Sequence, residues 1–150
     1  MKIKIQKIHE DAKLPRKENK HDSGWDIFSV QDYIIKPNGR VKVSTGLIWE
    51  PQADYNEDFI IEAQVRAKSG LALNEGLSVL NGVGTVDMTY RDEICVLLYN
   101  TSRHEVKINK GQKIAQLVFQ KLPIFTIEEG IIDLKHTINR KGGFGSTGLI

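Results

Sequence analysis

The last residues of the chain, 139–150, carry several groups able to contact a ligand. They include two cations, one large aromatic ring and two hydroxyls, namely Arg140, Lys141, Phe144, Ser146 and Thr147. Four of the thirteen glycines of the chain also lie here, which gives the backbone freedom to wrap around a small molecule. The segment therefore suits a tail that closes over a phosphorylated, ring-bearing ligand. The alternative is a disordered terminus without a function.

Two glycine patterns look like nucleotide-binding fingerprints but lack the rest of their motifs. Gly143 and Gly148 have the spacing of a P-loop, yet Leu149 stands where that motif needs lysine. Gly82 and Gly84 lack the third glycine and the strand-helix-strand pattern of a dinucleotide site. The four histidines and the single cysteine match no zinc-site spacing. The sequence thus argues against a P-loop, a Rossmann site and a structural zinc site.

Short strands are the elements that must position the ligand-binding groups. Apolar residues recur with a period of two in the segments 3–5, 41–43, 59–65, 106–108 and 114–119. Asn and Gly residues between these segments indicate tight turns with positive φ angles, as at Pro37-Asn38-Gly39. One helix is expected, from Ser69 to Glu75, with Ser69 as its N-cap. This pattern predicts an all-β fold, an antiparallel sandwich or barrel.

Composition and charge favour one compact cytosolic domain. The 150 residues include 21 Lys and Arg against 19 Asp and Glu, and the resulting net charge of +2 is too small to indicate a nucleic-acid binder. No apolar run approaches the roughly 20 residues that a membrane-spanning helix needs. The only cysteine, Cys95, lies in an apolar run and fits a reducing compartment.

Five sequence motifs, taken together, identify a family. They are Ser23-Gly24-Trp25-Asp26, Arg66-Ala67-Lys68-Ser69-Gly70-Leu71, the segment 81–91 with Asp87 and Tyr90-Arg91, Gly111-Gln112-Lys113-Ile114-Ala115-Gln116-Leu117, and Gly142-Gly143-Phe144-Gly145-Ser146-Thr147-Gly148. In this order the motifs make the chain similar to the trimeric dUTP diphosphatases, or dUTPases. With the intervening strands, the resemblance covers nearly the whole chain.

The resemblance implies a fold and an assembly. The expected fold is a distorted jelly-roll-like β-barrel of the dUTPase-like, or β-clip, type with one short helix. Residues 1–138 would form this domain, and the flexible glycine-rich tail 139–150 would close over an active site. The expected partner is a second and third copy of the chain, because sites of this family are shared in a homotrimer. There one subunit provides motifs I, II and IV, another the motif III hairpin, and the third the tail.

The resemblance also implies a reaction. The expected enzyme hydrolyses dUTP to dUMP and pyrophosphate, using Mg²⁺ and a water molecule that an aspartate directs onto the α-phosphorus. This activity limits uracil incorporation into DNA and supplies dUMP for dTMP synthesis. The expected location is the cytoplasm, or the host cytosol for a viral or phage protein, with no membrane or nucleic-acid partner.

The implied site residues follow from the motifs one by one. Asp87 matches the catalytic carboxylate, and Asp26 matches the aspartate that supports Mg²⁺ through ordered water. The implied substrate-binding residues are Arg66, Lys68, Ser69, Gly70, Asn81, Gly82, Val86, Tyr90, Gln116, Arg140, Gly143, Phe144, Gly145, Ser146 and Thr147. In the family the 81–84 hairpin receives uracil, the tyrosine stacks on the deoxyribose and excludes ribose, and the tail phenylalanine stacks on uracil.

Each of these residue types also has a structural interpretation. Asp87 and Asp26 are common turn residues, and Asn81-Gly82 is a common tight turn. Tyr90 could face the core, and the cations around Ser69 could be a solvated cluster at the helix start. Gln116, inside an apolar strand, could be a satisfied buried amide.

Three positions depart from the family pattern. Lys68 replaces the usual arginine, which exchanges a bidentate fork for a point charge. Asp92 stands where the family usually has glycine. Arg140 lies one residue closer to the Gly-Gly-Phe sequence than the usual tail arginine, and Asn139 occupies that arginine's place.

Two other functions remain open from the sequence. The first is a dCTP deaminase, alone or combined with dUTPase activity, for which Glu93 is the only acid near the required place. The second is a dUTP-sensing protein that binds a partner and does not release pyrophosphate. The presence of both Asp87 and Tyr90 favours dUTP hydrolysis.

Overall fold

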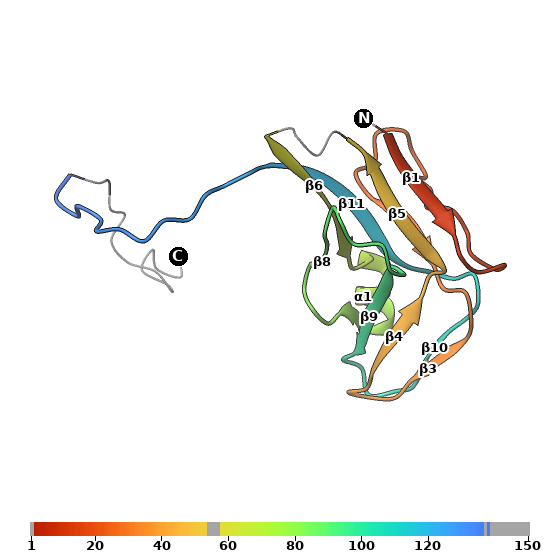
Figure 1. The fold of residues 1–150 in the computed structure, drawn as a ribbon. Helices are drawn as coiled ribbons and strands as arrows, with labels where there is room; N and C mark the ends of the chain where they lie inside the picture. The colour runs from red at the N-terminus through yellow and green to blue at the C-terminus, as the bar shows by residue number, and fades with distance from the viewer. Residues whose placement is uncertain (1, 54–57, 137, 139–150) are drawn as a thin grey trace.

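The computed structural model describes residues 2–53, 58–136 and 138, and its described part is almost entirely β-structure (Figure 1). The strands and the one helix, in chain order, are β1 (Lys2–Lys7), β2 (Trp25–Phe28), β3 (Tyr33–Ile35), β4 (Arg40–Ser44), β5 (Leu47–Gln52), β6 (Phe59–Arg66), α1 (Ser69–Glu75), β7 (Leu77–Val79), β8 (Gly84–Val86), β9 (Cys95–Asn100), β10 (Val106–Ile108) and β11 (Lys113–Pro123). The prediction of an all-β fold with one short helix is confirmed.

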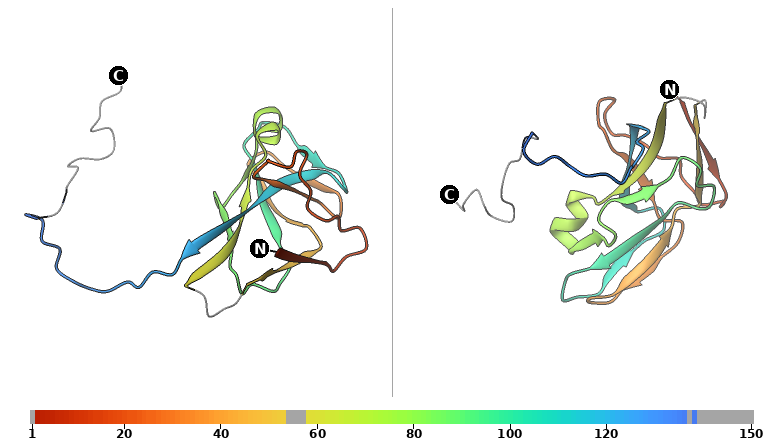
Figure 2. Two further views of the ribbon diagram at one scale, coloured as in Figure 1. Left: turned by 90° about the horizontal axis from the view of Figure 1, so that it is seen from above. Right: turned by 60° about the vertical axis from the view of Figure 1, so that its left-hand side comes forward.

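Within the described residues, all strand pairs are antiparallel and form four small sheets. The largest has the order β2-β11-β6-β8, and a second has the order β4-β9-β7. Two further pairs join β1 with β5 and β10 with β3. The long strand β11 runs beside β6 across the middle of the molecule (Figure 2). Strands from distant parts of the chain therefore meet around one interior, as in a barrel.

The core consists of inward-facing residues of these sheets. Trp49, Leu98 and Leu117 are at most 1% exposed, and the rings of Trp49 and Phe119 lie 5.7 Å apart between centroids. The alternation of buried and exposed residues along β6 follows from the two-residue period of its side chains. Burial of large apolar side chains stabilises the fold by roughly 1.5–3 kcal/mol each.

Strand β11 contains a β-bulge at its start. Its register against β2 shifts between Lys113 and Ala115, so that two residues of β11 advance against one of β2. Ile114 and Ala115 are consequently both buried, although they are neighbours in sequence. The bulge brings Lys113 and Gln116, three residues apart, to the same side of the strand.

Helix α1 and one tight turn differ in detail from the expected structures. The helix has the predicted bounds, but its N-cap is Lys68, and no side chain bonds to its free amides. Ser69 is the first helical residue, so its prediction as N-cap is wrong. In the Pro37-Asn38-Gly39 turn the positive φ angle, 54°, belongs to Asn38. Asparagine tolerates this left-handed conformation better than most residues do.

After β11 the chain leaves the body as an extended arm, residues 124–136 (Figures 1 and 2). Its apolar side chains lie almost entirely in solvent, with Phe125 77%, Ile127 96% and Ile131 102% exposed. Residues 139–150, the predicted tail, are outside the described residues. No helix in the described ranges is long and apolar enough to cross a bilayer.

Candidate functional site

Asp26, on β2, is the centre of a charged cluster. Asp26 is 5% exposed, and three side chains contact its carboxylate. The Lys68 Nζ lies 2.5 Å from Oδ1, the Lys113 Nζ lies 2.8 Å from Oδ2, and the Gln116 side chain donates a 3.3 Å hydrogen bond to Oδ1. A buried carboxylate is costly unless it is paired, and here two ammonium groups pair it.

The same contacts set the protonation of the cluster. Burial by itself raises the pKa of Asp26, but the hydrogen bonds from Lys113, Lys68 and Gln116 outweigh it and lower the pKa below its ordinary value. The hydrogen bond to Asp26 likewise raises the pKa of Lys113. The cluster therefore holds an ionised carboxylate between two charged lysines.

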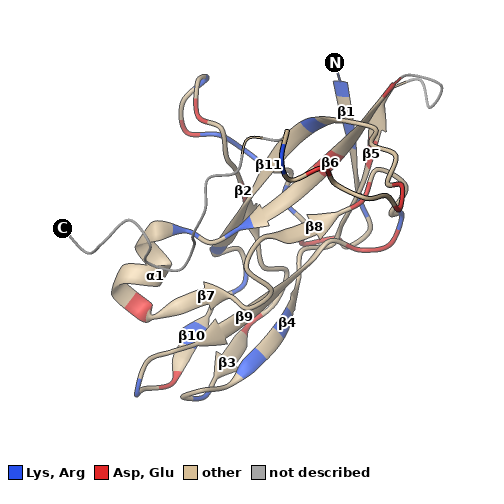
Figure 3. Ribbon diagram, turned by 90° about the vertical axis from the view of Figure 1, so that its left-hand side faces the viewer, with Lys and Arg blue, Asp and Glu red and all other residues tan. Residues whose placement is uncertain are grey.

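The other predicted phosphate-binding residues lie beside this cluster. Gln116 is the register partner of both Asp26 and Arg66, which places Arg66 on the next strand of the same sheet. Arg66 is exposed, and its guanidinium donates to the Gln64 side chain at 3.0 Å. Figure 3 shows Lys and Arg where β6 runs into α1. The chain thus presents cations at one end of β6.

The start of α1 adds uncharged donors to the same region. Ser69 and Gly70 are exposed in the first turn of the helix. Nothing lies within 4 Å of where a Cβ of Gly70 would stand, so the backbone there is open to a ligand. Backbone amides at a helix start carry a partial positive charge, and this favours an anion.

A second group of predicted residues lines a cavity of about 510 Å³. The cavity is lined by Lys42, Asn81, Thr85, Val86, Asp87, Tyr90, Asp92, Glu93, Ile94, Cys95 and Leu97. It brings together the hairpin, the candidate catalytic carboxylate and the candidate sugar-stacking ring. Its volume is in the range usual for sites that bind small organic ligands.

Local backbone geometry shapes the hairpin side of this cavity. Gly82 has a φ of +74°, and its amide donates to the Val79 carbonyl at 3.1 Å in a tight turn. The Asn81 side-chain nitrogen lies 3.2 Å from where a Cβ of Gly84 would stand. A side chain at position 84 would therefore crowd the Asn81 amide, and glycine avoids this contact.

Tyr90 and Asp87 are held by the turn that follows β8. The Tyr90 amide donates to the Asp87 carbonyl at 3.0 Å, and the Tyr90 hydroxyl donates to the Glu93 carbonyl at 3.1 Å. Burial, together with the nearby Asp92 charge, raises the pKa of Tyr90, so the ring stays neutral. The Asp87 side chain is exposed and belongs to the cavity lining.

Glu93 has a structural contact of its own. Its Oε1 accepts the Gly46 amide at 2.7 Å, and Gly46 has a left-handed φ of +65°. The Thr45 hydroxyl donates to the neighbouring Ile94 carbonyl at 2.5 Å. Glu93 thus anchors the β4–β5 turn as well as lining the cavity.

Within one chain the two groups of residues do not form one pocket. Asp26, Arg66, Lys68 and Gln116 are absent from the cavity lining. The two groups are nevertheless joined by one sheet. Strand β6 pairs with β8 up to Val65 and Gly84 and then continues to Arg66. The predicted tail residues Arg140, Gly143, Phe144, Gly145, Ser146 and Thr147 lie outside the described residues.

Two features of the site were not predicted from the sequence. The pairing of Lys113 with Asp26 depends on the bulge in β11, because in a regular strand residues 113 and 116 would face opposite sides. The second feature is Trp25, which is 36% exposed next to Asp26 with the Lys17 Nζ 4.8 Å from its ring centroid.

The chain is similar to known proteins over nearly its whole length. A dUTPase family model matches residues 10–148. The chain is 45% identical over 151 residues to a deoxyuridine 5'-triphosphate nucleotidohydrolase of Hydrogenobaculum sp., with 99% of both chains covered. It is 43% identical over 152 residues to a protein of the same name from Helicobacter pylori, covering 99% of this chain and 98% of that protein.

Solved structures show the same fold at lower sequence identity. The dUTPase of Staphylococcus bacteriophage 80alpha, solved as a mutant with dUpNHpp, superposes with a TM-score of 0.80 at 20% identity and covers 99% of both chains. The dUTPase from phage phi11 of S. aureus, whose structure describes a structural Mg(II) ion, gives 0.72 at 20% identity over 89% of this chain and 97% of that one. The jelly-roll-like fold is thereby confirmed.

Proposed function

The chain belongs to the dUTPase family, and from this premise we propose that it hydrolyses dUTP to dUMP and pyrophosphate. One observation carries the proposal for this chain: Asn81, Val86, Asp87 and Tyr90 line a single cavity. Asn81 belongs to the 81–84 hairpin, which we propose receives uracil. Such a reaction limits uracil in DNA and supplies dUMP for dTMP synthesis. The lone thiol of Cys95 fits the cytosol as the place of the reaction.

The cavity residues divide the recognition of the nucleoside. The Asn81 amide and the exposed backbone around Gly82 offer donors and acceptors to the polar edge of uracil. The backbone at Val86 completes the hairpin wall. The neutral ring of Tyr90 packs against the deoxyribose, and an added 2′-hydroxyl would have to displace it. The specificity thus rests on shape as well as on hydrogen bonds.

Asp87 is the group we assign to the chemical step. Its carboxylate is exposed to the cavity, so a water molecule can bind to it and be turned toward the α-phosphorus. As the oxygen attacks, the proton passes to the carboxylate, and the bond from the α-phosphorus to the bridging oxygen breaks. Pyrophosphate leaves, and dUMP carries the new hydroxyl.

The cation cluster would hold the phosphates. Lys68 contacts Asp26 in the free chain and can exchange that contact for a phosphate oxygen, while Lys113 continues to pair the carboxylate. Arg66 supplies a bidentate fork, and Ser69, Gly70 and Gln116 add hydrogen bonds. Preformed donors of this kind stabilise the charge that develops on the leaving pyrophosphate.

Mg²⁺ is the proposed cofactor, and the chemistry of Asp26 fits a hydrated ion. The described residues hold no cluster of three carboxylate, histidine or cysteine side chains that would enclose a bare metal. Mg²⁺ keeps several waters and binds substrate phosphates, so one carboxylate acting through water is sufficient. When bound, the ion would neutralise phosphate charge and help to orient the triphosphate.

We propose a homotrimer in which each site combines two clusters from different subunits. Two observations support this assembly. The Asp87 cavity and the Asp26 cluster are separate within one chain, whereas one substrate must touch both. The arm exposes a run of large apolar side chains that a second copy of the chain would cover.

The tail 139–150 is proposed as the lid of this site, and residues 1–138 as the domain that carries it. Arg140 would contact the terminal phosphate, Phe144 would stack on uracil, and Gly143, Gly145, Ser146 and Thr147 would wrap the phosphates. Stacking of a base on an aromatic ring contributes roughly 1–3 kcal/mol. Closure would exclude water, and opening would release the products.

A pyrophosphate-release assay across dUTP, dTTP, UTP and dCTP, with and without Mg²⁺, tests the function. The expected result is Mg²⁺-dependent release from dUTP alone. Ammonia release from dCTP would favour the deaminase alternative, for which Glu93 is already engaged with the Gly46 amide. Tight dUTP binding without pyrophosphate release would favour a sensor that binds a partner.

A further inference from the structure

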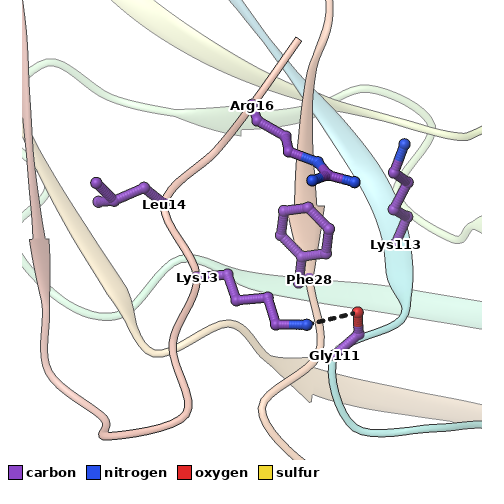
Figure 4. Close-up of a pocket in the computed structure, with 6 residues that line it drawn as sticks. All are labelled: Lys13, Leu14, Arg16, Phe28, Gly111 and Lys113. Atoms are coloured by element: carbon purple, nitrogen blue, oxygen red, sulfur yellow. Dashed lines mark hydrogen bonds between the residues drawn. The ribbon is translucent and has the colours of Figure 1, made fainter. Parts of the chain in front are cut away.

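A smaller cavity lies between the loop that joins β1 to β2 and the start of β11 (Figure 4). Its lining consists of Lys13, Leu14, Arg16, Phe28, Gly111 and Lys113, and its volume is about 270 Å³. We call it the Phe28 cavity. None of the nucleoside-binding residues borders it. Its size is below the usual range for drug-sized ligands and suits a small ion.

Three cations from two separate segments converge on this cavity. In Figure 4 the side chains of Lys13 and Arg16 flank the Phe28 ring, and Lys113 stands across from them. The Lys13 Nζ lies 5.5 Å and the Arg16 Cζ 5.6 Å from the ring centroid. Cation–π contacts hold both groups near the cavity and leave their N–H donors available.

The charge of the cavity is only partly neutralised. Lys113 is paired with Asp26 at 2.8 Å and with Glu18 at 3.5 Å, and nearby Asp11 is paired with Lys110 at 3.1 Å. Among the residues that the structure describes, Lys13 and Arg16 have no carboxylate within ion-pair distance. Two cations thus line the cavity without a counter-charge.

The backbone holds these cations in place. The Lys13 Nζ donates to the Gly111 carbonyl at 3.3 Å, and Gly111 has a φ of +77°. A Cβ at position 111 would stand 2.5 Å from the Lys13 Nζ, so a larger residue there would push the lysine tip aside. Arg16 is fixed by a two-way backbone pair with Asp26, at 3.1 and 2.8 Å. The segment that carries Lys13 and Arg16 is therefore held against β2 and the turn before β11.

We propose that the Phe28 cavity binds inorganic pyrophosphate beside the Asp26 cluster. Lys113 belongs to both places, since its Nζ pairs with Asp26 while its side chain lines the cavity. Arg16 offers a fork that matches two oxygens of one phosphate group, and Lys13 offers a point charge to the other. The physiological meaning rests on the proposed function, because that reaction would release pyrophosphate next to the Asp26 cluster, which shares Lys113 with the Phe28 cavity.

Calorimetric titration of the full-length protein with sodium pyrophosphate tests this inference, in magnesium-free buffer at low ionic strength. Titrations are run with and without a saturating non-hydrolysable dUTP analogue. The variants are Lys13→Gln and Arg16→Gln, which remove the charge of each side chain and leave a shorter, neutral polar one. Lys17→Gln is the matched control, because Lys17 stacks on Trp25 at 4.8 Å and does not line the cavity.

We expect pyrophosphate to bind in the presence of the analogue, and Lys13→Gln and Arg16→Gln each to weaken it about tenfold. Lys17→Gln should stay within about twofold of the original chain, since it removes only a screened charge. Equal affinities for all variants, or loss of pyrophosphate binding once the analogue is present, would overturn the inference. Because the titration needs no turnover, its result is separate from the outcome of the dUTP assay.

Discussion

At the scale of single residues, two aspartates of the site differ in their surroundings. Asp26 is 5% exposed and held by Lys68, Lys113 and Gln116, whereas Asp87 is exposed in a cavity. The oxygens of Asp26 are paired with lysines, so this carboxylate holds the lysines in place. The carboxylate of Asp87 faces a cavity, where it can accept a proton. We therefore propose different roles for the same residue type, a positioning group at 26 and the base at 87.

Replacement of Asp87 by asparagine tests the proposed base. Asp87→Asn keeps the size and exposure of the side chain, so the protein should fold and assemble normally. Loss of a general base should lower kcat about 10²–10⁴-fold. Steady-state pyrophosphate release measures the change, and circular dichroism is the control for folding. A variant that keeps most of its turnover would remove Asp87 from the chemical step.

Acid unfolding tests the charge cluster. The pKa of Asp26 is lowered in the folded chain, so its contribution to stability is fully present above its ordinary pKa of 3.8. That contribution is lost as the pH falls through the lower, folded-state value. Urea unfolding at a series of pH values from about 5 to 2 should show a steeper loss for the original chain than for Asp26→Asn. Equal slopes would mean that the pairing of Asp26 contributes little.

At the scale of elements, turns with left-handed residues hold the site together. Gly46 and Gly82 both have φ near +70°, at +65° and +74°, but they differ in their surroundings. A Cβ at position 46 would lie 2.7 Å from the His9 Cβ and 2.9 Å from the Ala12 Cβ, whereas nothing lies within 4 Å at position 82. The first turn is enclosed, and the second is open to a ligand.

This pair separates backbone strain from crowding. Gly82→Ala should cost about 1–2 kcal/mol, the penalty for a left-handed residue. Gly46→Ala should cost a further amount of about 1–3 kcal/mol, because its neighbours must move. Chemical denaturation of the two variants under the same conditions measures the difference. Equal losses would mean that the packing around Gly46 relaxes freely.

The strands were predictable to the extent that their side chains alternate. The pattern of Phe59 to Val65 indicates β6, and it holds because one face of that strand is buried. Strand β3 was not predicted, because its sequence Tyr33-Ile34-Ile35 is apolar throughout and shows no alternation. The N-cap at Lys68 was missed because the sequence rule assigns that role to a hydroxyl such as Ser69, while here the backbone turns one residue earlier.

The motifs name the candidate site residues, but local physics does not predict how these residues meet. Asn81 and Asp87 are six residues apart, and only the fold of the hairpin and β8 brings them to one cavity. The partners of Asp26 are Lys68, between β6 and α1, and Lys113 and Gln116 on the bulged strand β11, and the order of residue types gives no signal for this meeting. Long-range pairing of this kind is decided by the sheet register.

At the scale of the whole molecule, two features of the protomer favour an assembly of several copies. Its two candidate ligand-binding clusters are separate. Its arm leaves the body (Figure 1), and the apolar side chains of the arm are exposed. A contiguous exposed apolar surface of this kind commonly marks an interaction surface. Both observations are explained if assembly completes the site and the surface together.

Deletion of residues 139–150 tests the proposed lid. The arm remains in this variant, so size-exclusion chromatography with light scattering should still show a trimer. Loss of the proposed contacts from Arg140 and Phe144 should lower kcat/KM severely. Unchanged kcat/KM in the shortened protein would refute the lid, and a monomer would mean that the tail also serves assembly.

The two tryptophans of the chain give it a built-in optical signal. Trp49 is 1% exposed in the core, while Trp25 is 36% exposed beneath Lys17 and adjoins Asp26 in the chain. Fluorescence of Trp49 is shielded from aqueous quenchers, whereas the emission of Trp25 responds to solvent, to iodide and to any anion that draws Lys17 away. Arrival of a ligand at β2 can therefore be followed in real time without a dye.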